Sequence, residues 1–239
     1  MRDWCVVLPT YNEADNLPGI ANDLLALDAG DMGILVVDDA SPDGTGDVAD
    51  ELSEKHPGRV HVIHRPSKLG LGTAYVDGFR WAIQRGARNV IQMDADYSHS
   101  VHHIPKFLEL IKAYDLVIGS RYIAGGSVYP NRTAARSLLS WWANSLLSPR
   151  VLGPRVKDAT SGFRCWRATA LEAIGLDRIR SKGYVFQVEM CHLAHRQGLR
   201  IIETPIHFDI RRHGKSKMSL GIQVEAIAWF LGMFFHFRR

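Results

Sequence analysis

Short runs of apolar, mostly β-branched residues alternate with segments of helical spacing through the first half of the chain. The short runs predict buried strands, and apolar residues repeated every three or four positions predict amphipathic helices. The predicted strands are residues 5–8, 34–37, 60–64, 90–93 and 116–118, and the predicted helices are residues 13–27, 45–55, 70–83 and 105–112. This alternation indicates an α/β fold with a mostly parallel sheet and helices on both of its faces.

The second half of the chain has a different pattern. Residues 133–152 and 189–197 are predicted helices, residues 201–205 a strand, and residues 220–237 a last helix that follows a basic loop. Neither an internal repeat nor a linker-like stretch divides the sequence. We therefore expect one domain over residues 1–217 and a C-terminal helical elaboration over residues 218–239.

The composition is that of a folded globular protein, because 46% of the 239 residues are hydrophobic and 23% are charged. The longest apolar run, residues 226–235, is shorter than the roughly 18 residues of a membrane span, and the N-terminus does not resemble a signal peptide. The three cysteines, Cys5, Cys165 and Cys191, are odd in number and widely spaced. They argue against a disulfide framework and a zinc site, and they fit a reducing cytoplasm.

The net charge of +4 is unevenly distributed. Residues 1–60 hold 13 acidic and 3 basic residues, whereas residues 61–239 hold 12 acidic and 26 basic residues. A basic second part predicts an anionic partner, which the charge alone leaves open as a phosphate, a membrane surface or a nucleic acid. A solvated basic surface is the plain alternative.

Polar residues stand where three predicted strands end: residues 9–13 after the first, Asp38 and Asp39 after the second, and Asp94 and Asp96 after the fourth. Ligands of open α/β sheets bind beyond the carboxyl ends of the strands. The chain has no dinucleotide-binding glycine motif and no P-loop, which argues against a dehydrogenase or an NTPase. Two carboxylates spaced i, i+2 on such a loop suit Mg²⁺ or Mn²⁺, although a solvated turn gives the same pattern. His99 is a further ligand, a supporting group or a structural residue.

Four segments resemble a known family: residues 6–13 (VVLPTYNE), 36–45 (VVDDASPDGT), 93–99 (MDADYSH) and 119–122 (GSRY). In this order they are similar to the inverting GT-A (Rossmann-like) glycosyltransferases of family 2, and most of all to the dolichol-phosphate (polyprenol-phosphate) mannose synthases. Residues 158–164 (DATSGFR) and 211–217 (RRHGKSK) match that branch too. The resemblance therefore spans about residues 5–217.

The resemblance implies a nucleotide-sugar donor at the strand ends, with Mg²⁺ or Mn²⁺ as cofactor. The implied nucleotide-binding residues are Pro9, Tyr11, Asn12, Glu13, Asp39, Lys68 and Gly70. Among these, Asp39 would hold the nucleoside. Asp94 and Asp96 are the implied metal ligands and catalytic residues. Ser98 stands where the family often has Gln, and it would be a weaker ligand.

A polyprenyl phosphate acceptor is a monoester with a second pKa of about 6, so it is largely ionised at neutral pH. It therefore needs no general base, but it does need cations, for which arginine is well suited. The candidate cations are Arg121, Arg136, Arg211 and Lys217. Arg121 and Arg211 are the predicted catalytic residues among them. By resemblance, Arg136 with Ser140, and Arg211 with Lys217, surround the lipid phosphate.

The predicted activity is a metal-dependent, inverting transfer of mannose from GDP-mannose to a polyprenyl (dolichyl) phosphate. It would occur on the cytoplasmic face of a membrane, to which the protein is peripheral. The alternatives are a polyprenyl-phosphate glucose synthase that uses UDP-glucose, another family-2 transfer, or a protein of a different class that binds nucleic acid or transfers nucleotidyl groups. No nucleic-acid motif supports that last class. Residues 226–239 suit a helix on the membrane surface, on the domain or against a membrane-anchoring subunit.

Overall fold

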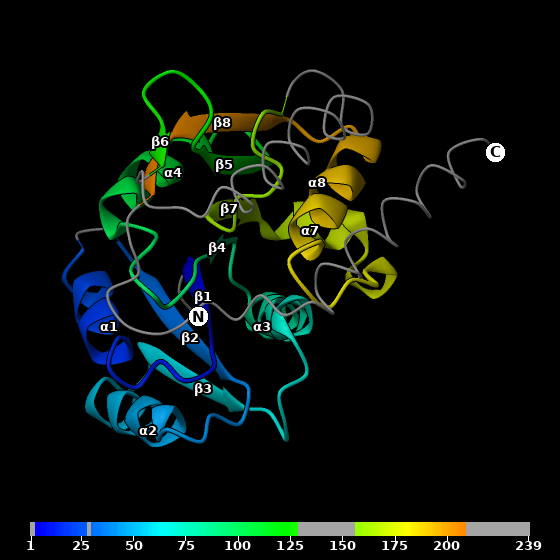
Figure 1. Ribbon diagram of the computed structural model, residues 1–239. Coiled ribbons are helices and arrows are strands. Elements are labelled where there is room, and N and C mark those ends of the chain that lie inside the picture. Colours follow the sequence, from blue (N-terminus) through cyan, green and yellow to red (C-terminus); the bar gives the residue numbers. More distant parts are fainter. Residues whose placement is uncertain (1–2, 28–29, 129–155, 209–239) are drawn as a thin grey trace.

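The computed structural model describes residues 3–27, 30–128 and 156–208. They form an α/β fold around one large sheet (Figure 1). The strands are β1 (Trp4–Thr10), β2 (Met32–Asp38), β3 (Val60–His64), β4 (Asn89–Gln92), β5 (Leu116–Ser120), β6 (Ser127–Val128), β7 (Arg164–Arg167), β8 (Ile201–Pro205) and β9 (His207–Phe208). The α-helices are α1 (Leu17–Ala26), α2 (Thr45–Lys55), α3 (Leu71–Gln84), α4 (Ile104–Leu110), α7 (Ala168–Ile174) and α8 (Phe186–Arg196), and the 3₁₀ turns are η1 (Val101–His103) and η3 (Leu176–Arg178).

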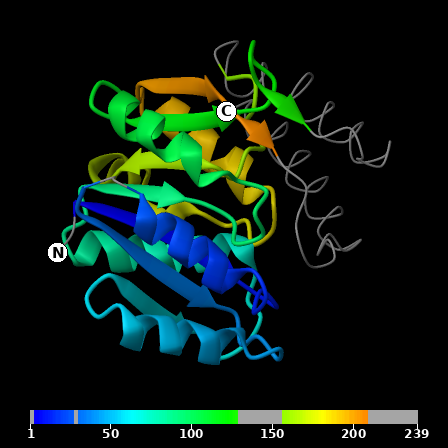
Figure 2. The ribbon, with the colours of Figure 1, turned by 90° about the vertical axis from the view of Figure 1, so that its left-hand side faces the viewer.

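The large sheet has seven strands in the order β3-β2-β1-β4-β7-β5-β8, and β6 pairs with β9 in a separate small sheet. The first four of these strands are mutually parallel, as are β5 and β8, whereas β7 is antiparallel to both of its neighbours. This confirms the predicted mostly parallel sheet. The carboxyl ends of β1, β2 and β4 consequently lie at one edge (Figure 2), and the loops that follow them meet there.

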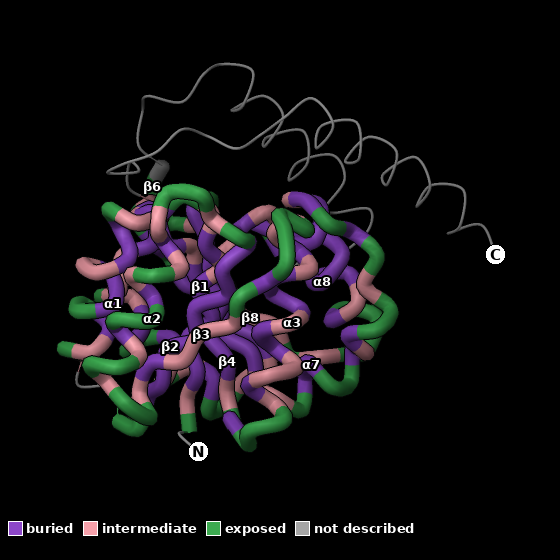
Figure 3. Tube along the Cα trace, turned by 90° about the horizontal axis from the view of Figure 1, so that it is seen from below, coloured by how far each residue is buried: buried purple, intermediate pink, exposed green. Residues whose placement is uncertain are grey.

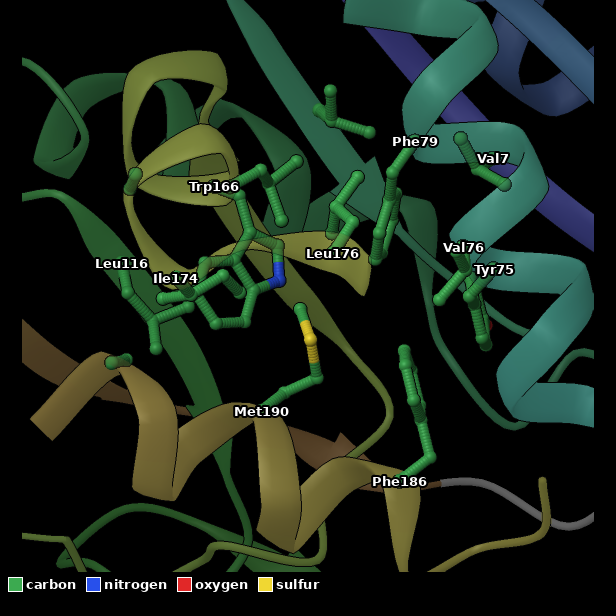
Figure 4. Close-up of a cluster of buried hydrophobic side chains, with 14 of the residues drawn as sticks. Val7, Tyr75, Val76, Phe79, Leu116, Trp166, Ile174, Leu176, Phe186 and Met190 are labelled. Atoms are coloured by element: carbon green, nitrogen blue, oxygen red, sulfur yellow. The ribbon is translucent and has the colours of Figure 1, made fainter. Parts of the chain in front are cut away.

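Successive side chains of a strand point to opposite faces, and each face carries its own core. Val7 and Val37 belong to a cluster with residues of α3, α7 and α8, part of which is drawn in Figure 4. Val6 and Val36 belong to a second cluster with residues of α1, α2 and α4. Helices therefore cover both faces as predicted, and the buried strands lie between them (Figure 3).

Several predicted boundaries were wrong. The first helix begins at Leu17 instead of residue 13, because the carbonyl of Glu13 accepts hydrogen bonds from the backbone N–H groups of Asn16 and Leu17 in a turn. By contrast, the predicted bounds of α2 are confirmed, with Gly44 as its N-cap and the Thr45 hydroxyl donating to Asp43. Helix α8 begins at Phe186, before the predicted residue 189.

The largest error concerns β7 and α7, which the sequence pattern left without an assignment. No element is predicted over residues 164–174, but residue 164 is the first residue of a strand inside the sheet. The predicted helices 133–152 and 220–237 lie outside the described residues, as does the proposed C-terminal segment 218–239. Within the residues that are described, no helix is long and apolar enough to cross a membrane.

Candidate active site

The loops at the carboxyl edge of the sheet have unusual backbone geometry. Among the residues described, the non-glycine residues with positive φ are Asn12 (57°), Ala40 (53°) and Tyr97 (65°). Each follows one of the strands β1, β2 and β4. A left-handed conformation costs a non-glycine residue about 1–2 kcal/mol, and such strain concentrates at functional sites. The backbone thus marks this edge independently of its side chains.

A cavity of about 210 Å³ opens among these loops. The sequence-predicted residues that line it are Pro9, Tyr11, Glu13, Asp39, Lys68, Gly70, Asp94 and Asp96. They come from the ends of three strands and from the loop that precedes α3. The structure therefore brings together residues up to 87 positions apart, between Pro9 and Asp96. Asn12 and Ser98 stand beside the lining residues in the chain but do not themselves line the cavity.

Asp39 lines the cavity, and polar groups hold its carboxylate in place. Its Oδ1 accepts a hydrogen bond from Arg65 within an ion pair, and its Oδ2 accepts one from the backbone N–H of Gly70 at 3.1 Å. Burial raises the pKa of Asp39, and the nearby charge of Arg65 offsets this only in part. Arg65 also donates to Thr73 Oγ1 at 2.6 Å, so it ties the end of β2 to the start of α3. Nearby, the Lys68 ammonium stands 3.8 Å from the centre of the Tyr11 ring.

Asp38, next to Asp39, has a structural role. Its Oδ1 accepts a hydrogen bond from Thr10 Oγ1 at 3.0 Å, and its Oδ2 accepts one from the backbone N–H of Ser41 at 3.0 Å. These bonds join the ends of the parallel strands β1 and β2. The two acidic residues at the end of β2 thus have different roles: Asp38 stabilises the loop, and Asp39 lines the cavity.

Asp94 and Asp96 also line the cavity. Asp94 Oδ1 accepts a hydrogen bond from the hydroxyl of Tyr75 at 2.8 Å, and the Asp94 backbone N–H donates to His99 Nδ1 at 3.1 Å. Asp96 Oδ1 accepts from both the backbone N–H and the hydroxyl of Ser98. The Ser98 hydroxyl, predicted as a weak metal ligand, thus contacts Asp96.

His99 is 2% exposed and stacks on Phe163 with ring centres 4.9 Å apart. Together with its bond to the Asp94 backbone, this gives it a structural role in the loop. Burial, and then the charge and hydrogen bond of Asp94, hold the pKa of Tyr75 well above its usual value. Tyr75 is therefore protonated at neutral pH, and its hydroxyl is the donor to Asp94.

The two aspartates fit a hard divalent cation that keeps most of its other ligands as water or substrate oxygen. Both carboxylates border one cavity, and oxygen ligands are those that Mg²⁺ and Mn²⁺ prefer. Nowhere in the described part of the chain do three or more His, Cys, Asp or Glu side chains gather in a way that could hold a metal. A site of two carboxylates suits an ion bridged to substrate phosphates better than an ion held by protein alone.

Arg121 does not line this cavity. Its Nε and Nη2 each donate to the carboxylate of Asp158 at 2.7 Å, and its backbone N–H donates to the same group at 2.9 Å. The two side chains are 7% and 0% exposed. The structure therefore places this predicted catalytic residue in a buried ion pair. The other predicted acceptor residues, Arg136, Ser140, Arg211 and Lys217, lie outside the described residues.

Sequence reasoning missed a third wall of the cavity, Lys182-Gly183-Tyr184, which directly precedes α8. This segment rests on the start of α3, because the Lys182 carbonyl accepts a hydrogen bond from the backbone N–H of Gly72 at 2.8 Å. A side chain at Gly72 would meet the Ser181 carbonyl oxygen at 2.6 Å. The sequence predicts a helix that begins at Gly70, but it does not indicate that residues 182–184 pack against the start of this helix.

The model of glycosyl transferase family 2 matches residues 5–175. An undecaprenyl-phosphate mannosyltransferase of Micrococcus luteus is 48% identical over 224 residues, which are 92% of this chain and 89% of that protein. A polyprenol monophosphomannose synthase of Mycolicibacterium smegmatis is 46% identical over 215 residues, which are 90% of this chain and 80% of that protein.

Solved structures share the fold at lower sequence identity. A glucosyl-3-phosphoglycerate synthase from Mycobacterium tuberculosis, in complex with Mn²⁺, UDP-glucose and phosphoglyceric acid, superposes with a TM-score of 0.69 and 19% identity. The match covers 97% of this chain and 79% of that one. The same enzyme in complex with Mn²⁺, UDP and glucosyl-3-phosphoglycerate gives a TM-score of 0.69 at 20% identity.

Proposed function

The chain belongs to glycosyl transferase family 2, and we propose that it transfers mannose from GDP-mannose to a polyprenyl phosphate. The observation that carries the proposal is that Asp39, Asp94 and Asp96 line the same cavity. A site for a nucleotide sugar needs a group that accepts hydrogen bonds from the nucleoside. It also needs ligands for the cation that binds the diphosphate. The two relatives named for mannosyl transfer to lipid phosphates support this choice of substrates.

The donor would lie along the cavity with its nucleoside toward Asp39. The Gly70 N–H and Arg65 hold that carboxylate in place, so it would meet the base or ribose without reorganising. Asp94 and Asp96 would hold Mg²⁺ or Mn²⁺, which neutralises the charge that develops on the leaving diphosphate. Lys68 and Lys182 border the same space and would add positive charge.

The acceptor phosphate would attack the anomeric carbon from the face opposite the leaving diphosphate, which inverts its configuration. Because the phosphate is already anionic, no carboxylate base is needed, and binding rests on cations. We propose that Arg136, Ser140, Arg211 and Lys217 provide this binding. Residues 226–239 would bring the enzyme to the cytoplasmic face of a membrane, either directly or through an anchoring subunit.

A donor screen with the full chain tests the proposal. GDP-mannose, UDP-glucose and UDP-N-acetylglucosamine are each offered with a short polyprenyl phosphate and Mg²⁺ or Mn²⁺, and the lipid product is identified by mass spectrometry. We expect a mannosyl phospholipid from GDP-mannose, and no product from the unphosphorylated polyprenol. Transfer from UDP-glucose but not from GDP-mannose would contradict the proposed donor. Transfer to the unphosphorylated alcohol would contradict the proposed phosphate acceptor.

Two variants separate the donor site from the acceptor site. Asp96→Asn should abolish both transfer and the slow hydrolysis of the donor by water, whereas the exposed Asp177→Asn (93% exposed) should leave both intact. Arg211→Ala should lower kcat/KM for the lipid phosphate about 10- to 100-fold, the loss expected for a hydrogen bond to a charged group. It should leave hydrolysis unaffected. Equal losses of hydrolysis and transfer would assign Arg211 to the donor diphosphate.

A further inference from the structure

Helix α3 and its N-cap contact two of the acidic residues that line the cavity. At its start, the backbone N–H of Gly70 donates to Asp39 Oδ2 at 3.1 Å. Further along the helix, the hydroxyl of Tyr75 donates to Asp94 Oδ1 at 2.8 Å. One helix therefore holds both the carboxylate proposed to bind the nucleoside and a carboxylate proposed to bind the metal ion.

The Tyr75 ring is held firmly, so the position of its hydroxyl is fixed. Tyr75 is fully buried. Its ring is almost parallel to that of Phe186, at an interplanar angle of 2° and a centroid distance of 5.8 Å, and it stacks on Phe79 at 5.7 Å. Figure 4 shows Tyr75 and Phe79 on α3 with Phe186 facing them from α8. The phenol ring thus packs between α3 and α8, and its hydroxyl contacts Asp94, which lines the cavity.

Asp94 and Asp96 are held by different devices. The Asp96 carboxylate is held within its own loop by Ser98, two residues away. The Asp94 carboxylate is held by Tyr75, 19 residues away on a packed helix, while its backbone is held by His99. Asp94 is therefore tied to a packed helix through Tyr75 as well as to its own loop.

We propose that Tyr75 is a positioning residue that sets the orientation of the Asp94 carboxylate for a divalent cation, an inference that rests on the proposed metal-dependent function. A hydrogen bond to Oδ1 limits rotation of the carboxylate and presents its second oxygen in a defined direction. Without the hydroxyl, the cation would have to order this group itself. Partners that orient metal ligands in this way typically contribute 10- to 100-fold to metal affinity, roughly.

The test is a titration of the full chain with Mn²⁺ in the presence of GDP, followed by electron paramagnetic resonance of the free ion. Tyr75→Phe keeps the ring and its stacking, and it should weaken Mn²⁺ binding about 10-fold or more. Binding of GDP in EDTA, measured by calorimetry, should not change. A partly unfolded sample would lower the number of sites instead of the affinity, so instability and lost positioning give different results.

Trp166→Phe is the matched control. It removes the hydrogen bond from Trp166 Nε1 to Gln92 at 3.3 Å and part of a buried ring in the same hydrophobic cluster as Tyr75, but it leaves the hydrogen bond from Tyr75 to Asp94 in place. It should leave Mn²⁺ affinity unchanged. In an Asp94→Ala background, Tyr75→Phe should cause no further loss, because the residue acts through Asp94. Equal Mn²⁺ affinities of wild type and Tyr75→Phe would overturn the inference, whereas a wild-type chain that binds no Mn²⁺ would overturn the metal-dependent function itself.

Discussion

The buried pair of Arg121 and Asp158 offers a sharp test of how this fold is stabilised. Asp158 is fully buried and accepts three hydrogen bonds from Arg121, one from the backbone and two from the guanidinium, and a fourth from Thr160. Asp158→Asn keeps the size of the side chain, but it removes the charge and turns one acceptor into a donor. The Arg121 guanidinium, 7% exposed, is then left without a counter-charge.

Removing one partner of a buried ion pair costs about 3–5 kcal/mol, because the remaining charge is neither solvated nor paired. The low exposure of both groups means that solvent screening reduces this figure little. We therefore expect Asp158→Asn to lower the free energy of unfolding by about 3–5 kcal/mol, measured by urea denaturation at pH 7. The control is Asp177→Asn, which breaks the exposed ion pair with Arg80 and should cost less than about 1 kcal/mol.

The effect should also depend on pH. Burial opposes the charged form, but the charge and hydrogen bonds of Arg121 outweigh it and hold the pKa of Asp158 below its usual value. The stability from this group is therefore fully present above the unfolded-state pKa of about 3.9, and it is lost as the pH falls through the lower folded-state pKa. The difference between wild type and Asp158→Asn should be constant at neutral pH and shrink in acid. Equal, pH-independent costs for Asp158→Asn and Asp177→Asn would refute this reasoning.

Three further predictions follow from other parts of the structure. Asp39→Ala should weaken GDP binding about 10-fold or more by calorimetry, since a charged acceptor in the cavity is lost; unchanged affinity would exclude Asp39 from the donor site. Gly78→Ala should lower the urea midpoint, because the new Cβ would lie 2.4 Å from Val7 Cγ1, and overpacking costs about 1–3 kcal/mol, more than the roughly 1 kcal/mol that alanine gains in a helix. Native protein at pH 8 should react with a thiol reagent only in traces, and urea should expose all three cysteines, because burial raises the pKa of Cys5 to about 12 and that of Cys191 to about 11; fast labelling of the native protein would contradict their burial.

The sequence alone was sufficient for the parallel half of the sheet and for most of the cavity. A parallel strand buried on both faces is marked by a continuous apolar run. The carboxyl ends of parallel strands lie on the same side of the sheet, so residues that follow them, such as Asp39 and Asp94, are expected to come together there. This inference requires neither the register of the strands nor the positions of the side-chain atoms in the cavity.

The errors arose where a residue's role depends on a distant partner. Arginine is usually found on the surface or in loops. Arg164 is nevertheless fully buried, and it donates to the backbone carbonyls of Ala159, Ser161 and Gln187. Its strand β7 was therefore missed. The pairing of Arg121 with Asp158 was not foreseen either, since nothing local in the sequence indicates a partner 37 residues away. Lys182 escaped notice because its place in the cavity depends on the glycines that begin α3.

The position of β7 in the sheet has a consequence for the order in which the chain acquires its structure. Strands β1 to β4 find all of their parallel neighbours within the first 92 residues, so this half of the sheet can pair before β5 is synthesised. Strand β5 ends at Ser120, but its two neighbours begin only at Arg164 and Ile201. During synthesis, the edges of β4 and β5 stay unpaired until β7 emerges and joins the two halves. The unpaired edges are where a nascent chain is most exposed to aggregation.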